Sequence, residues 1–140
     1  MELRDADASD VPRLAVWNEQ LIEDENAPYR LDRPALETRM RGWLAAEYRA
    51  VVFRVDGRAI GYALYRAEDG GFYLRQFVID RSARRRGHGR RAIELLKARV
   101  FGPGARISLQ VLNQNAVGLT FWRAVGFEDA AQTLVAQVPG

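Results

Sequence analysis

The spacing of apolar residues changes partway along this chain, and that change restricts the fold more than any other feature. Apolar residues recur at helical spacing before residue 45, and Asn18 is a polar residue on the first of those stripes. From Ala50 to Ile79 the spacing is that of strands, with hairpin signals at Asp56-Gly57 and Gly70-Gly71. Helical spacing followed by a strand meander in 140 residues predicts a single α/β domain.

The remaining elements alternate along the chain. In order, we expect a strand at 1–4, helices from about 11 and 34, strands at 50–55, 60–65 and 72–79, a helix at 88–100, a strand at 107–111, a helix at 115–125 and an extended end at 127–138. This β-α-α-β-β-β-α-β-α-β order predicts an α/β (α+β mixed) fold over 1–140. Its central sheet is mostly antiparallel and flanked by about four helices.

Composition excludes several classes of function. The chain has no cysteine and a single histidine, His88, so it has no thiolate nucleophile and no histidine cluster, and we expect no metal. No stretch approaches the roughly 20 apolar residues of a membrane span. The charged start MELRDADASD lacks the apolar core of a secretory signal, which favours a cytoplasmic location.

Positive charge is concentrated in one segment. The net charge is +3, the only lysine is Lys97, and six arginines lie within 81–91. Such a patch indicates an anionic partner. A nucleic-acid-binding module is one reading, but the patch has no interleaved aromatic residues for base stacking and leaves the nearby glycines unexplained.

The segment Arg84–Arg90 joins an expected strand to an expected helix. The first turn of a helix has free N–H groups and the positive end of the dipole. Because Gly87 and Gly89 lack Cβ atoms, an anion can approach the backbone closely. The segment matches neither the P-loop pattern nor the dinucleotide-binding G-x-G-x-x-G pattern. It predicts a pyrophosphate cradle, and the alternative is a solvated basic turn with packing glycines.

Two motifs resemble those of the GNAT acyltransferase superfamily. Arg84-Arg85-Arg86-Gly87-His88-Gly89 is similar to the signature [Q/R]-x-x-G-x-[G/A], and Val111, Asn115 and Phe121–Phe127 resemble a second block. The resemblance covers essentially the whole chain. It implies an N-acetyltransferase, an acyltransferase for groups other than amino-acyl groups. Such an enzyme moves acetyl from acetyl-CoA to an amine of a small molecule, peptide or protein by direct attack in a ternary complex. The alternative is a non-catalytic acyl-CoA-binding sensor or partner domain.

The resemblance also implies where coenzyme A binds. Its pyrophosphate would lie on the N–H groups of residues 85–90 and its pantetheine arm beside the strand that ends at Ile79, with a main-chain N–H near Val78 facing the carbonyl oxygen. Asn115 would contact the arm, cap a helix, or do both. The implied CoA-binding residues are Phe77, Val78, Ile79, Arg84, Arg85, Arg86, Gly87, His88, Gly89, Arg90, Asn115 and Trp122.

Trp122 departs from the family pattern. Many members have a tyrosine there as the acid toward the departing thiolate, and an indole cannot serve as a practical acid. The role is then vacant, or is filled by water, by the amine's own proton or by another tyrosine. Tyr62, Tyr65 and Tyr73 are the candidate tyrosines, and no catalytic residue is assigned.

The first two helices and their connection usually shape the acceptor pocket in this family. Here the connection begins with Glu23-Asp24-Glu25, which would attract a cationic amine. Strand alternation puts Arg75 and Gln76 on opposite faces of the sheet, and we favour Gln76 as the one that reaches the acceptor site. The acceptor-site candidates are Asn18, Asp24, Glu25, Tyr62 and Gln76. The expected partners are acetyl-CoA and an amine acceptor; a cationic acceptor and a homodimer both stay open, and neither nucleic acid nor a membrane is expected.

Overall fold

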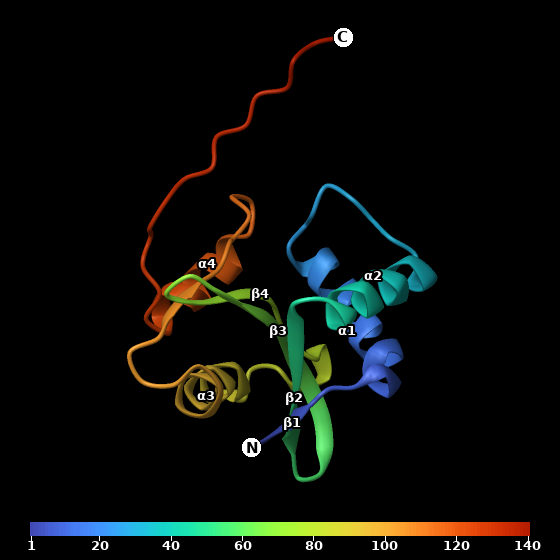
Figure 1. Cartoon of the computed structure of the whole chain (residues 1–140), viewed down its shortest axis with the longest axis vertical. Helices are drawn as coiled ribbons and strands as arrows, with labels where there is room; N and C mark the ends of the chain where they lie inside the picture. The colour runs from blue at the N-terminus through green and yellow to red at the C-terminus, as the bar shows by residue number, and fades with distance from the viewer.

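Five strands in the order β1-β2-β3-β4-β5 form the central sheet of the protein (Figure 1). The computed structural model describes residues 1–140. The strands are β1 (Glu2–Asp5), β2 (Tyr48–Val55), β3 (Arg58–Glu68), β4 (Gly71–Ile79) and β5 (Arg106–Ser108). The first four pair antiparallel, and β5 pairs parallel with β4. The predicted meander, with its turns at Asp56-Gly57 and Gly70, is confirmed.

Helices cover both faces of the sheet. The helical elements are α1 (Val11–Asp24), α2 (Arg33–Ala45), α3 (His88–Leu95), which continues as a π-helical turn (Leu96–Phe101), α4 (Ala116–Ala124), and short 3₁₀ turns at Ala8–Asp10 and Arg81–Ala83. Leu14, Trp17 and Met40 of α1 and α2 pack with Tyr62 and Val78 on one face of the sheet. Ile93 and Leu96 pack with Phe53 on the other face. None of these helices is long and apolar enough to cross a membrane.

A bulge in β4 changes which side chains share a face. Leu74 lies opposite Tyr65 and Gln76 lies opposite Leu64, so Arg75 is an extra residue in β4. Arg75 contacts Trp43 of α2, and Gln76 contacts Tyr62 in the cluster beneath α1. Both side chains therefore lie on the α1–α2 face. The expectation that alternation separates them is wrong, because the bulge resets the alternation between the two.

The C-terminal end differs from the predicted element order. The observed order agrees with the prediction as far as α4, but residues 127–140 pair with no strand. The segment runs extended away from the rest of the molecule (Figure 1), and Leu134 and Val138 are exposed. The expected final strand does not form because β5 ends at Ser108 and its continuation offers no regular edge for pairing.

Candidate functional site

A slot opens where β4 and β5 separate. The two strands pair only from Gly71 to Tyr73, so the rest of that edge of β4 has no neighbouring strand. The slot encloses about 50 Å³ and is lined by Leu21, Glu25, Leu74, Arg75, Gln76, Phe77, Leu109, Gln110, Val111, Asn115 and Trp122. Residues 109–112, on the far wall, are in no regular element, so this wall can yield to a ligand arm wider than the slot.

The free edge of β4 presents main-chain groups to this slot. The N–H of Asp80 donates to the Ile60 carbonyl oxygen of β3 at 2.7 Å. Because successive backbone groups alternate, the N–H of Val78 points toward β3 as well, and those of Phe77 and Ile79 point toward the slot. The strand geometry thus favours Phe77 over Val78 as the donor to a carbonyl oxygen held there.

The loop before α3 has the shape of an anion cradle. Gly87 is the N-cap of α3 with φ +78°, and Arg85 also has a positive φ of 64°. None of the six N–H groups from Arg85 to Arg90 has an acceptor among the turn, cap and side-chain hydrogen bonds of the chain. Gly89 is closely packed, since a Cβ there would lie 3.1 Å from the Phe121 ring. The loop is a row of unpaired donors at the positive end of a helix.

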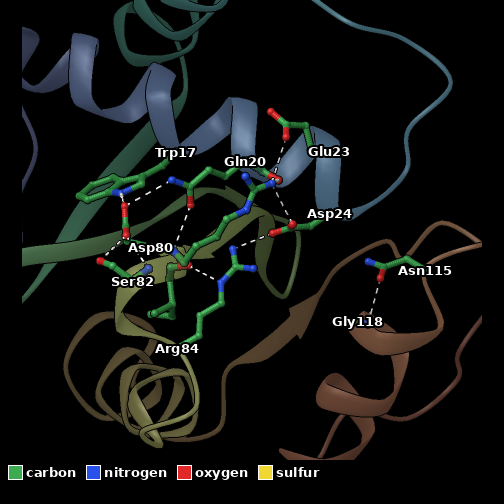
Figure 2. A network of polar contacts seen from close by, with 11 residues as sticks. Trp17, Gln20, Glu23, Asp24, Asp80, Ser82, Arg84, Asn115 and Gly118 are labelled. Carbon is green, nitrogen blue, oxygen red and sulfur yellow. Dashed lines mark hydrogen bonds and ion pairs between the residues drawn. The ribbon is translucent and has the colours of Figure 1, made fainter.

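Two arginines of the loop bind α1 instead of pointing into the cradle (Figure 2). Arg84 Nη2 lies 2.6 Å from Asp24 Oδ2, and Arg84 Nε donates to the Ile79 carbonyl oxygen at 2.8 Å. Arg81 Nη2 lies 3.2 Å from both Glu23 Oε2 and Asp24 Oδ1. These pairs neutralise most of the acidic stretch and tie the end of α1 to the loop. Arg85, Arg86 and Arg90 are exposed and free of carboxylate partners.

Asp80 connects the same loop to the middle of α1. Its Oδ2 accepts from Trp17 Nε1 at 2.9 Å and Gln20 Nε2 at 3.4 Å, and its Oδ1 accepts from the Ser82 N–H at 2.8 Å (Figure 2). Partial burial would raise the pKa of Asp80, but the hydrogen bonds from Ser82, Trp17 and Gln20 outweigh it and lower the pKa to about 2. The carboxylate is therefore a stabilising anchor for the loop.

We expect Asp80→Asn to lower the free energy of unfolding by about 1–2 kcal/mol at pH 7, because the charged acceptor is lost. A folded-state pKa below the unfolded value of about 3.9 stabilises the fold above that pH, and this contribution fades as the pH falls toward about 2. Urea unfolding at pH 7 and at a pH of about 2.5 measures how much the variant loses in free energy of unfolding under each condition. Asp56→Asn, in an exposed hairpin turn, is the control. An equal loss at both pH values would contradict this account.

The slot brings together two of the five predicted acceptor-site residues. Glu25, the C-cap of α1, is half-buried in its wall and forms no ion pair. Burial, and then the negative charge of Asp24, raise the pKa of Glu25. Gln76 lines the slot and accepts a hydrogen bond from Tyr62 at 2.6 Å. A half-buried carboxylate with a raised pKa is suited to proton transfer.

The other three predicted residues lie outside the slot lining. Tyr62 is fully buried behind Gln76, and burial raises the pKa of its hydroxyl. Asn18 is buried and accepts from Arg39 Nη2 of α2 at 3.0 Å. Asp24 is paired with the loop arginines. None of the three side chains lines the slot; Tyr62 contacts Gln76 of the slot wall, and Asn18 and Asp24 contact arginines outside the lining.

Asn115 and Trp122 both line the slot. The Asn115 side chain also caps α4, accepting a hydrogen bond from the Gly118 N–H at 2.9 Å (Figure 2). Asn115 is therefore both a helix cap and part of the slot wall. Trp122 packs edge-on against Phe77 at 5.3 Å between ring centroids. Of the tyrosines considered as acids, Tyr73 has its hydroxyl 3.4 Å from Gln110 Oε1 on the slot wall, whereas Tyr65 packs among Phe72 and Phe101.

A larger hollow of about 580 Å³ lies elsewhere, between the end of α2 and the β1–β2 edge. It is lined by Asp5, Ala6, Asp7, Ala8, Val11, Arg41, Leu44, Ala45, Tyr48, Arg49 and Ala50. It has neither the free β4 edge nor the unpaired loop amides. The smaller slot is therefore the better candidate for the functional site, because it has these unpaired main-chain groups, although the hollow has more volume.

The slot and cradle agree with the family to which the chain is matched. Residues 17–127 match the model of the acetyltransferase (GNAT) family, and the chain belongs to that family. No curated protein matches the chain in sequence.

Solved structures share the fold at low identity. A mutant of the BH1408 protein from Bacillus halodurans has a TM-score of 0.76 and 19% identity, over 99% of this chain and 100% of that one. A possible acetyltransferase from Clostridium difficile 630 has a TM-score of 0.75 and 17% identity, over 99% and 97%. The aminoglycoside N-acetyltransferase AAC(6')-Iy in complex with CoA has a TM-score of 0.73 and 18% identity, over 98% and 93%.

Proposed function

We propose that the protein transfers an acetyl group from acetyl-CoA to an amine, with both substrates bound at once. The observation that carries the proposal is the continuity of the cradle and the slot: the unpaired N–H groups of Arg85–Arg90 begin one turn beyond the free edge of β4. A diphosphate fits the cradle through main-chain donors, and an extended amide-bearing arm fits an unpaired strand edge. Bound acetyl-CoA supplies the acetyl group as a thioester.

Different residues of the chain carry out the other parts of the reaction. The N–H of Phe77 faces the slot and is placed to stabilise negative charge on a carbonyl oxygen. Glu25 takes the proton that the amine loses on becoming an amide, and its raised pKa brings it closer to working pH. Gln76, held by Tyr62, is placed to orient the acceptor. The thiolate regains a proton at the slot, where the Tyr73 hydroxyl beside Gln110 is the candidate donor in place of Trp122.

The second candidate is a domain that binds acyl-CoA without turnover, and the indole at Trp122 favours it. Release of free thiol from acetyl-CoA, followed across a panel of amines, separates the two. Amine-dependent release supports the enzyme. Calorimetric binding of acetyl-CoA without release from any amine would favour the sensor, and no binding at millimolar concentration would refute both.

A further inference from the structure

Arginines and aromatic rings alternate along the α2 side of the sheet, next to the slot. We refer to Arg39, Trp43, Arg75, Tyr48 and Arg66 as the arginine–aromatic strip. The guanidinium carbons of Arg39 and Arg75 lie 4.6 and 4.7 Å from the ring centroid of Trp43. The Tyr48 hydroxyl accepts from Arg75 Nη1 and from Arg66 Nε, both at 3.2 Å. The strip holds three guanidinium groups close together.

Positive charge on the strip is only partly neutralised. Arg66 has two carboxylates near it, Glu47 at 3.9 Å and Glu68 at 3.8 Å. Arg39 and Arg75 contact aromatic rings and hydrogen-bond acceptors but no carboxylate. The strip therefore has a net positive charge, and Arg75 brings that charge to the lining of the slot.

Two of the three carboxylates of the acidic stretch at the end of α1 do not offset this charge. Glu23 and Asp24 are paired with Arg81 and Arg84 on the loop side. Glu25 is the one carboxylate that lines the slot. An acceptor entering the slot meets one carboxylate suited to its amine and one guanidinium suited to an anion.

Two buried donors behind the strip also lack an acceptor. Asn18 Nδ2 and Arg39 Nε are buried and make no hydrogen bond, although Asn18 Oδ1 and Arg39 Nη2 are 3.0 Å apart. Buried donors are normally paired, so these two add unpaired N–H groups to the positive end of the strip.

The geometry of Arg75 suits it to an oxyanion. Its guanidinium lies over Trp43 and donates one hydrogen bond to Tyr48. Stacking occupies the face of a guanidinium and leaves the N–H groups in its plane, which match the paired oxygens of a carboxylate or a phosphate. Arg75 is also exposed, so a solute reaches it directly.

We propose that the acceptor amine also carries an oxyanion, a carboxylate or a phosphate, that binds Arg75 at the mouth of the slot. The inference rests on the proposed acetyl transfer and narrows its acceptor. It replaces the cationic acceptor suggested by the acidic stretch, because the loop arginines neutralise most of that stretch. Arg75 is then a specificity-determining residue, and Arg39 and Arg66 increase the positive potential around it.

Two matched pairs of amines test the proposal. Beta-alanine is compared with beta-alaninamide, and O-phosphoethanolamine with ethanolamine, in the thiol-release assay with saturating acetyl-CoA. We expect Arg75→Gln to lower kcat/KM at least tenfold, mainly through KM, for the carboxylate-bearing or phosphate-bearing member of one pair or both. The members without this oxyanion change less than twofold. Comparing each amine between the wild type and the variant cancels its intrinsic reactivity, and the two pairs distinguish a carboxylate from a phosphate acceptor.

Arg49→Gln removes the same charge from an exposed position on β2 and is the matched control. The Arg49→Gln variant must keep the preference for amines that carry a carboxylate or a phosphate. Equal losses for amines with and without the oxyanion in Arg75→Gln, or a wild type that prefers the members without it, would overturn the proposal. If no amine causes release, acetyl transfer itself fails. Calorimetry of beta-alanine and O-phosphoethanolamine with CoA present then decides the anion site, since binding that Arg75→Gln abolishes supports it and no binding refutes it.

Discussion

Replacing Gly87 with glutamate is expected to weaken acetyl-CoA binding by more than about 100-fold, or roughly 3 kcal/mol. Gly87 sits at the centre of the unpaired N–H groups, and open space surrounds the position of its missing Cβ. A carboxylate there would occupy the positive end of α3 and repel the diphosphate. Isothermal titration calorimetry with acetyl-CoA measures the change.

Gly87→Ala separates charge from backbone strain. The positive φ of 78° costs any side chain about 1 kcal/mol, so both variants lose similar stability. The alanine variant should nevertheless retain acetyl-CoA binding within about tenfold. Similar affinity losses in the two variants would show that the strained backbone, and not an anion site, accounts for the effect.

Glu25→Gln is expected to lower kcat by about 100-fold or more, the usual contribution of a general base. The amide keeps the size of the side chain at the end of α1 but cannot accept the amine's proton. Acetyl-CoA affinity should stay unchanged, because Glu25 contributes no group to the cradle. Steady-state thiol release and calorimetry together measure this separation.

The pH profile gives Glu25 a distinct signature. A protonated carboxyl cannot act as a base, so the wild-type rate falls as pH drops through the pKa of Glu25, which burial and Asp24 raise above the ordinary range. The variant lacks this acid limb. Glu23→Gln, two residues away and paired with Arg81, is the matched control and should keep it. An unchanged acid limb in Glu25→Gln would remove Glu25 from the mechanism.

The sequence predicts local structure well, because local structure depends on short-range patterns. The meander follows from strand spacing and the Asp56-Gly57 turn, and the structure confirms it. Gly87 has the αL conformation at the start of α3 and the N–H groups around it are unpaired, which is compatible with the cradle that the sequence suggests; anion binding there stays a prediction. The resemblance to the family is confirmed over residues 17–127.

Features that depend on contacts between distant segments could not be predicted. The pattern of β4 contains no signal that Arg75 is an extra residue, so alternation places it on the wrong face. The pairing of Arg84 with Asp24 joins residues 60 positions apart and leaves Glu25 as the carboxylate of the acidic stretch that lines the slot. Only the three-dimensional structure shows that Arg39 and Arg75 both contact the Trp43 ring and that Arg75 donates to the Tyr48 hydroxyl.

A crystal structure with bound CoA tests the central claim most directly. The diphosphate should accept hydrogen bonds from the N–H groups of residues 85–90, and the pantetheine arm should run along β4 past Phe77 and Ile79. A nucleotide bound elsewhere on the protein, with the loop before α3 still making no contact to it, would contradict this account.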